Sequence, residues 1–350
     1  MNRAAIVYAL ASAALFGAST PFAKLLLGEV PPLLLASVLY LGSGSGLLLW
    51  LGARRLLRRA PRAPALVGSD YLWLGAAIVS GGVVAPVLLV FGLVRTDGAA
   101  ASLLLNLEAV LTAVIAWLAF RENVDRRVFL GMMAIVAGGV LLSWHELPRA
   151  GSLTGPLLIA AACAAWAIDN NLTRRVSGGD AAAIACLKGL VAGSINLALA
   201  FELGASLPPS KVLAAAGLVG FLGYGVSLVL FILALRHLGT VRTGAYFSVA
   251  PFFGAALALA LLGEQTTVFF WIAAALMALG VWLHVSERHE HEHVHEPAEH
   301  SHPHVHDEHH RHQHEFAWSG HEPHTHTHAH GRLAHSHPHY PDLHHRHSHH

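Results

Sequence analysis

Long apolar stretches occupy most of the first 286 residues, and they constrain the fold of this chain more than any other feature. A helix that crosses a bilayer needs about 20 mostly apolar residues. Ten such stretches follow one another, at 4–27, 33–52, 71–94, 99–120, 127–144, 155–172, 181–202, 212–235, 241–262 and 268–286. Charged residues make up only 12% of the chain, whereas soluble domains carry roughly 25%. The sequence therefore predicts an all-α integral membrane protein with ten transmembrane helices, and it argues against a soluble enzyme.

The basic residues predict the orientation, because short cytoplasmic loops are enriched in Lys and Arg. With the N-terminus inside, fourteen arginines fall on the inner side: Arg3, Arg54, Arg55, Arg58, Arg59, Arg62, Arg121, Arg126, Arg127, Arg174, Arg175, Arg236, Arg242 and Arg288. The outer side holds only Arg95, Arg149 and Lys211, with Lys24 near the outer end of the first span. We therefore expect a multi-pass protein of the inner membrane with both termini in the cytoplasm.

The apolar part of the chain contains an internal repeat. The segment 107–122 resembles the segment 249–264, and each is an apolar span closed by a glutamate. The repeat predicts two halves, 1–145 and 152–286, with five spans in each. An odd number of spans inverts the second half relative to the first. Inverted repeats are typical of transporters that bind substrate near the middle of the membrane.

The repeated segments also carry a family resemblance. The chain resembles the EamA-like branch of the drug/metabolite transporter superfamily, on the strength of Phe16-Gly17, Pro21-Phe22-Ala23-Lys24 and the two segments 107–122 and 249–264. The resemblance implies ten helices, cytoplasmic termini and movement of small organic solutes, often outward. One position departs from the pattern: the second half has Pro251, whereas the first half has Ala109 preceded by Glu108.

Glu108 is the first candidate for a functional group. It lies near the middle of its span, roughly 20 Å from the inner end at 1.5 Å per residue. A carboxyl group is costly at that depth, so it should face a cavity or a partner, and such residues are functional candidates by default. Glu108 could carry a proton or bind the amine of a substrate. The alternative is a structural glutamate that locks helices together.

Lys188 and Asp169 form a second candidate pair. Lys188 lies about 12 Å into the span 181–202, and Asp169 lies at a similar depth on the preceding span. Three interpretations stay open for Lys188: its long side chain extends to the inner interface, it neutralises Asp169, or it holds an anionic substrate.

Three further residues are cavity candidates. Pro21 and Pro251 are expected to interrupt their helices, and the freed carbonyl groups could line a cavity; kinks that serve packing are the alternative. Tyr246 is one of several aromatic residues that either line a pocket or belong to the core, with Tyr224, Phe247, Trp166 and Trp282.

The C-terminal segment has a different composition. All but three of the 28 histidines fall in the last 62 residues, many in the pattern His-x-His. Imidazole groups bind Zn, Ni, Co and Cu(II). The candidate ligands are His289, His291, His293, His295, His300, His302, His304, His306, His324, His326, His328, His330, His335, His337 and His339. We expect residues 287–350 to be a disordered cytoplasmic tail with several weak sites for a divalent metal (Ni, Zn or Co).

The sequence favours a secondary transporter that exports small metabolites by alternating access. No P-loop points to ATP as the energy source, no cofactor is required, and no catalytic constellation indicates an enzyme. Two alternatives stay open: a transporter of a transition metal or its chelate with the tail as loader or sensor, and a membrane-anchored metal buffer. The expected partners are the lipid bilayer, a small-molecule substrate and metal ions. A homodimer is open, and nucleic acid is not expected.

Overall fold

The computed structural model describes residues 3–57, 68–120, 126–144 and 153–285, with four strands in the C-terminal segment. The first half forms α1 (Arg3–Leu26), α2 (Pro32–Leu56), α3 (Gly68–Ala77), the π-helical segment η1 (Ile78–Val84), α4 (Ala85–Leu93), α5 (Gly98–Leu104), α6 (Leu107–Phe120) and α7 (Arg126–Trp144). The second half forms α8 (Thr154–Val176), α9 (Ala181–Glu202), α10 (Ser210–Gly220), the π-helical segment η2 (Phe221–Val226), α11 (Ser227–Phe247), α12 (Ala250–Leu262) and α13 (Val268–Val285). The chain divides into two units, Met1–Glu287 and Arg288–His350.

Within the described residues, seven helices are long and apolar enough to cross a membrane: Ala4–Leu26, Pro32–Leu56, Asp70–Leu93, Gly98–Ile115, Ala181–Glu202, Ser210–Leu238 and Thr243–Leu262. Two shorter apolar helices cover Phe129–Ser143 and Val268–Leu283. Helix α8 forms at the sixth expected span but is less apolar, because Asp169, Asn170 and Asn171 lie near its end. Large apolar side chains are exposed on the outside of the bundle, where lipid tails would contact them, among them Leu49, Leu72, Trp271 and Trp282.

One span boundary differs from the sequence prediction. The expected loop between 235 and 241 is wrong, since α11 continues through it. The helix breaks later, at Ser248–Val249, and Pro251 stands in the first turn of α12. Proline is tolerated there because a first-turn N–H has no partner within the helix. The first half breaks at the matching place, Leu105–Asn106, although Ala109 replaces the proline.

Pro21 does not end its helix. The expected interruption is wrong for this residue, because α1 runs continuously past it. Pro21 cannot donate to the carbonyl oxygen of Gly17 one turn earlier, and α12 approaches α1 closely at that point. A Cβ atom added to Gly254 would lie 2.8 Å from the Gly17 carbonyl oxygen. Small residues on both helices therefore permit the contact that joins the two halves.

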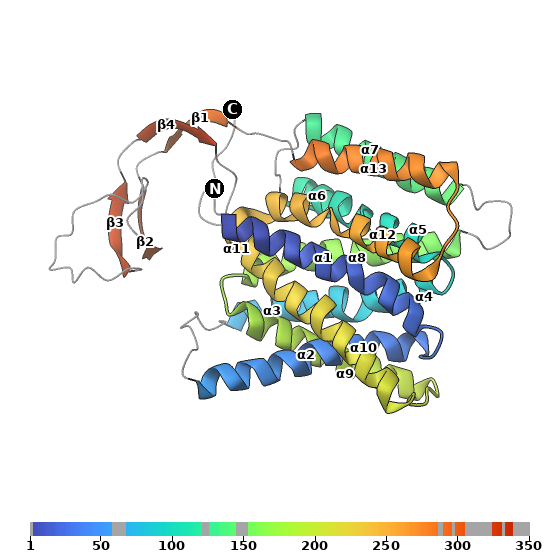
Figure 1. The fold of residues 1–350 in the computed structure, drawn as a ribbon. Coiled ribbons are helices and arrows are strands. Elements are labelled where there is room, and N and C mark those ends of the chain that lie inside the picture. The colour runs from blue at the N-terminus through green and yellow to red at the C-terminus, as the bar shows by residue number, and fades with distance from the viewer. Residues whose placement is uncertain are drawn as a thin grey trace. The chain divides into compact units, whose positions relative to one another are not determined.

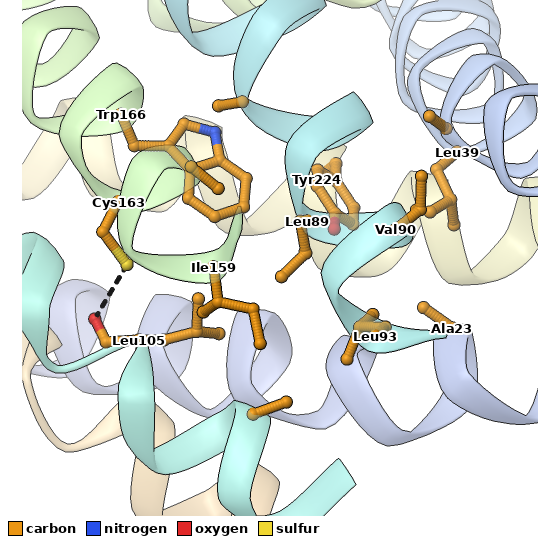
Figure 2. Packing of buried hydrophobic residues seen from close by; sticks show 14 of the residues in the cluster. Ala23, Leu39, Leu89, Val90, Leu93, Leu105, Ile159, Cys163, Trp166 and Tyr224 are labelled. Atoms are coloured by element: carbon orange, nitrogen blue, oxygen red, sulfur yellow. Dashed lines mark hydrogen bonds between the residues drawn. The ribbon is translucent and has the colours of Figure 1, made fainter. Parts of the chain in front are cut away.

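The two halves pack through equivalent helices. Helix α7 lies beside α13, and α2 packs along α9, as two repeats related by a two-fold axis would arrange them (Figure 1). Gly44 and Gly189 permit the second contact, because a Cβ atom on Gly44 would lie 2.5 Å from the backbone nitrogen of Leu190. Figure 2 shows the apolar core between α4 and α8, where Leu89 and Leu93 lie near Ile159.

Each half also contains one π-helical segment at a matching position, η1 in the first and η2 in the second. A π-helical turn disturbs the regular pattern of backbone hydrogen bonds and often marks a functional site. In η1 the carbonyl oxygen of Gly81 accepts hydrogen bonds from the Tyr40 hydroxyl (2.6 Å) and from Trp166 Nε1 (3.0 Å). The next carbonyl oxygen, of Gly82, accepts one from Asn196 Nδ2 (3.1 Å). The segment η1 is therefore hydrogen-bonded to three helices, α2, α8 and α9.

The C-terminal unit contains strands where the sequence predicts disorder. Strands β1 (Glu290–His295) and β4 (Leu333–Pro338) pair antiparallel, as do β2 (Ala298–His304) and β3 (His324–His330). The physical reason lies in the pattern itself, because the alternation His-x-His has the two-residue period of a strand. Disorder of the tail 287–350 stays a prediction.

Candidate functional site

A cavity lies between the two halves of the helical bundle. Its lining comes from both: Phe16, Tyr40, Ser43 and Glu108 from the first, and Trp166, Asp169, Asn170, Ala185, Lys188, Gly189, Gly223, Tyr224, Ser227, Leu228, Phe231 and Phe247 from the second. The cavity has a volume of about 60 Å³, which is room for about four water molecules. It therefore brings together all three charged residues singled out from the sequence.

Glu108 stands at the broken helix of the first half. It belongs to the first turn of α6, directly after the break, and only 9% of the residue is exposed. The N-terminal end of a helix carries a partial positive charge, which favours a carboxylate at this position. Among the residues that the structure describes, no Lys or Arg forms an ion pair with Glu108. Glu108 is therefore a buried carboxyl group without a cationic partner in this region.

Helix α8 supplies the hydrogen-bond partner of Glu108. Asn170 Nδ2 donates to Glu108 Oε1 at 2.7 Å and lies 3.4 Å from Thr112 Oγ1. The next residue, Asn171, donates to the Thr112 carbonyl oxygen (3.3 Å). The sequence marks these asparagines only as the polar end of a span. Asn106, which is close to Glu108 in sequence, instead donates to the carbonyl oxygen of Leu103.

Lys188 and Asp169 form a buried ion pair. Lys188 Nζ lies 2.5 Å from Asp169 Oδ1, 2.8 Å from Asp169 Oδ2 and 3.1 Å from Thr173 Oγ1. The Thr173 hydroxyl in turn donates to Asp169 Oδ1 at 2.8 Å. Of the three interpretations, neutralisation of Asp169 is confirmed. Extension of Lys188 to the interface is wrong, because the residue is only 2% exposed.

An aromatic cluster forms much of the cavity wall. Phe16 lies at its centre, with ring centroids 5.7 Å from Trp166, 5.7 Å from Tyr224 and 5.4 Å from Phe247. Tyr40 contacts Tyr224 at 5.3 Å. The sequence indicates Trp166, Tyr224 and Phe247 as pocket candidates but does not indicate Phe16 and Tyr40. Phe16 belongs to the Phe16-Gly17 motif of the family resemblance, but that motif does not place its ring in a pocket, and no local pattern marks Tyr40.

Three cavity candidates lie elsewhere. Tyr246 packs with Ala9 and Leu238 on another side of the bundle, because adjacent helical residues point about 100° apart and Phe247 occupies the cavity face. Pro21 and Pro251 are likewise outside the cavity lining. Pro21 lies in α1, which contacts α12, and Pro251 lies in the first turn of α12.

Charged residues near the helix ends act as caps. Both carboxylate oxygens of Glu264 accept backbone N–H bonds at 2.7 Å, from Gly98 and from Ala99 at the start of α5. Lys24 donates to the carbonyl oxygens of Leu93 and Thr96 near the end of α4. Glu122, the repeat counterpart of Glu264, lies outside the described residues. Glu264 of the second half thus caps the start of α5 in the first half and ties the two halves together.

Asp180 joins α2 to the start of α9. Its carboxylate accepts from the backbone nitrogens of Ala182 and Ala183 as an N-cap and pairs with Arg54. Burial alone would raise the pKa of this carboxyl group. The hydrogen bonds and charge of Arg54, together with the two N–H groups, outweigh burial and lower the pKa below its usual value.

The histidine segment is described at the level of its backbone. Register places His291 opposite His337 and His293 opposite His335 in one sheet. In the other sheet, three pairs of histidines face across the strands: His300 and His328, His302 and His326, and His304 and His324. Among the candidate ligands, His289, His306 and His339 lie outside the described residues. Among the side chains that the structure describes, no group of three or more metal-ligating residues occurs.

Comparison with known proteins identifies the family. The EamA-like transporter family matches this chain twice, over residues 3–144 and over residues 153–286. The chain belongs to the EamA-like transporter family. Its two matched segments account for the paired helix breaks and the paired π-helical segments. The resemblance seen in the sequence motifs is thereby confirmed, and this EamA-like protein is a multi-pass membrane protein.

Two individual proteins are similar to this EamA-like chain. A protein of Methanothermobacter thermautotrophicus named "Uncharacterized transporter" is 28% identical over 281 residues, which cover 77% of this chain and 82% of that protein. One crystal structure shares the fold, with a TM-score of 0.62 and 18% identity, and covers 81% of this chain and 96% of its own. Both the family and the named relative support membrane transport rather than catalysis.

Proposed function

We propose that this protein is a secondary transporter that exports small organic metabolites across the inner membrane, with proton coupling through Glu108. The observation that carries the proposal is the buried Glu108 carboxyl group, which borders a cavity between the two halves and lacks a cationic partner among the described residues. We further propose ten membrane crossings and cytoplasmic termini, in agreement with the arginine-rich inner loops. The moving parts are the two repeats, 1–145 and 152–286.

The chemistry of the cavity supports a single exchangeable proton. Asp169 and Lys188 neutralise each other, so their pair adds no net charge. The Tyr40 hydroxyl donates a hydrogen bond to the Gly81 carbonyl oxygen, and the Cys163 thiol lies near the carbonyl oxygens of Leu104 and Leu105 at the helix break. Glu108 remains as the group that can gain or lose a proton, while Asn170 can hydrogen-bond either form.

Alternating access requires the cavity to widen. The cavity is small, about 60 Å³, so in this proposal one repeat moves against the other to admit the substrate. The backbone N–H groups of Gly98 and Ala99 donate hydrogen bonds to Glu264, and these bonds hold the two repeats together at one end of the bundle. Close helix contacts at glycines such as Gly44 and Gly254 let helices slide with few interlocking side chains. In this proposal, the Glu264 contact opens when the cavity opens toward that end.

The decisive experiment measures efflux from proteoliposomes with and without a pH gradient, using a panel of labelled amines, amino acids, sugars and divalent metals. We expect efflux of one solute class to accelerate when protons can flow inward. Glu108→Gln should abolish this acceleration, because an amide cannot carry the proton. Glu202→Gln is the matched control, since Glu202 is an exposed glutamate at the end of α9. Acceleration that persists in Glu108→Gln would refute the coupling role.

Chromatography of the same samples distinguishes a monomer from a homodimer.

A metal-binding role of the tail is a second proposal. The observation that favours it is the backbone register of β2 and β3, which places three pairs of histidines opposite each other. Directly opposed residues in an antiparallel pair have Cβ atoms about 5 Å apart, a spacing at which two imidazoles can share one metal ion. The tail would then load or sense Ni, Zn or Co for the helical unit, or buffer these metals at the membrane.

Titration calorimetry on the isolated peptide 289–350 tests the metal proposal. We expect binding of Ni²⁺ or Zn²⁺ at neutral pH and release near pH 5, because neutral imidazole is the ligand and the usual pKa of a histidine side chain is about 6.5. Deletion of 289–350 should leave metabolite efflux unchanged if the tail only buffers metal. Loss of a metal-stimulated flux after deletion would identify the tail as a loader or sensor. Binding weaker than millimolar would refute any metal role.

A further inference from the structure

The charge of the cavity limits the class of substrate that it can bind. The described residues that line it include three charged groups, Glu108, Asp169 and Lys188. The Lys188 ammonium has three N–H donors, and its three contacts go to the two Asp169 oxygens and the Thr173 hydroxyl. No donor of Lys188 is left for an anionic substrate. Ionised Glu108 therefore gives this part of the cavity a net negative charge.

The cavity wall favours a positive ligand with a flat apolar body. Six aromatic residues line it, Phe16, Tyr40, Trp166, Tyr224, Phe231 and Phe247. Ring faces carry negative electrostatic potential and attract cations. The polar ends of Tyr40 and Trp166 are both occupied by the carbonyl oxygen of Gly81, so these two residues offer ring surface rather than hydrogen bonds.

We infer that the substrate is a small organic monocation, an amine whose ammonium group pairs with Glu108 and whose apolar body contacts the aromatic cluster around Phe16. This inference rests on the proposed transport function and names its substrate class. Among the described residues that line the cavity, Glu108 is the carboxylate without a charged partner, and an ammonium group supplies that partner. A carboxylate-bearing solute would meet Glu108 as a like charge, and a neutral solute would leave Glu108 without a counter-ion.

The inference implies competition between amine and proton. Protonation of Glu108 removes the charge that holds the ammonium group, so amine binding weakens as the pH falls. The other titratable groups lining the cavity are Asp169, Lys188, Tyr40 and Tyr224. The first two are paired with each other, and the hydroxyl of Tyr40 is hydrogen-bonded to Gly81. Exchange of one amine for one proton moves no net charge.

Three probes of equal ring size and different charge test the inference: 2-phenylethylamine, 2-phenylethanol and 3-phenylpropionate. Binding of each to the purified full chain is measured by calorimetry between about pH 6 and pH 9, a range in which the amine stays protonated, as lysine does. We expect the amine to bind at least about tenfold more tightly than the alcohol at the higher pH, and this preference to shrink toward pH 6. The carboxylate probe should bind most weakly.

Two pairs of variants assign the preference to named residues. Glu108→Gln should reduce the ratio of amine to alcohol affinity to near one at every pH, whereas Glu108→Asp, which keeps the charge, should retain most of it. Phe16→Leu should weaken the amine more than the alcohol, because it removes the central ring. Glu202→Gln, the exposed control, should behave as wild type. Thermal unfolding of each variant shows that the fold is retained.

The outcomes separate the inference from the proposed function. Selective amine binding that is lost in Glu108→Gln supports the inference. If the same protein moves no solute in liposomes, the proposed transport function is wrong while the inferred amine site stands. Equal binding of amine and alcohol, or tighter binding of the carboxylate, overturns the inference. Proton-accelerated efflux of a neutral or anionic solute would also overturn it while leaving the proposed function in place.

Discussion

Removal of the Lys188 side chain should destabilise the protein strongly. Lys188→Met keeps the length and apolar stem of the side chain but leaves the Asp169 carboxylate buried with only Thr173 as a partner. Breaking one partner of a buried ion pair costs about 3–5 kcal/mol in unfolding free energy. The three short contacts of Lys188 Nζ place the expected loss in that range. Lys211→Met, at an exposed lysine near the start of α10, should cost less than about 0.5 kcal/mol.

The double variant makes the prediction specific. Lys188→Met combined with Asp169→Leu removes both charges together, and replacing a buried pair by apolar residues is often neutral. We therefore expect the double variant to recover most of the stability lost in Lys188→Met. Unfolding in mixed detergent micelles, followed by circular dichroism, measures all three variants. A Lys188→Met variant as stable as wild type would refute the buried ion pair. A double variant no more stable than Lys188→Met would refute it as well.

Three further substitutions probe the surroundings of the cavity. Gly81→Ala should lower stability and disturb the ion pair, because its Cβ would lie 1.9 Å from an Asp169 oxygen, whereas Gly75→Ala, with no neighbour within 4 Å, should be neutral in thermal unfolding. Asp180→Asn should lower the melting temperature at pH 7 and make no difference at strongly acidic pH. Because folding lowers the pKa of Asp180, the carboxylate stabilises the fold above the usual pKa of 3.8, and this stabilisation is lost as the pH falls through the pKa of the folded protein. A constant difference across the pH range would contradict the pairing of Asp180 with Arg54. Glu264→Gln should cost about 1 kcal/mol, since an amide can accept only one of the two N–H bonds at the start of α5; unchanged unfolding would show that this cap contributes nothing.

The sequence predicts the helices well because each is set by local composition. Apolar length and flanking proline place α2 after Pro31, and the N-cap Asp180 starts α9 at the expected residue. The predicted end of the eighth span is wrong because Arg236, His237 and Gly239 interrupt the apolar pattern there without ending the helix, which packing against its neighbours supports. The π-helical segments are not predictable in the same way, because they depend on tertiary partners for their carbonyl oxygens.

The sequence predicts the charged residues of the site but not all of the aromatic residues that line the cavity. Glu108, Asp169 and Lys188 stand out in sequence because ionisable residues are rare within apolar spans. Tyr40 does not stand out, and Phe16 stands out only as part of the Phe16-Gly17 motif, because only packing brings these two aromatic residues to the cavity. Asn170 is visible as a polar residue, but its bond to Glu108 depends on the contact of α6 with α8.

Proton movement during transport is a direct test of proton coupling through Glu108. Proteoliposomes that contain an entrapped pH-sensitive dye report proton flux while a labelled solute from the efflux panel crosses the membrane. We expect about one proton to move against each solute molecule in wild type and in Glu202→Gln, and none in Glu108→Gln, because Glu108 is the one proposed exchangeable group. Equal proton flux in Glu108→Gln and wild type would contradict proton coupling through Glu108.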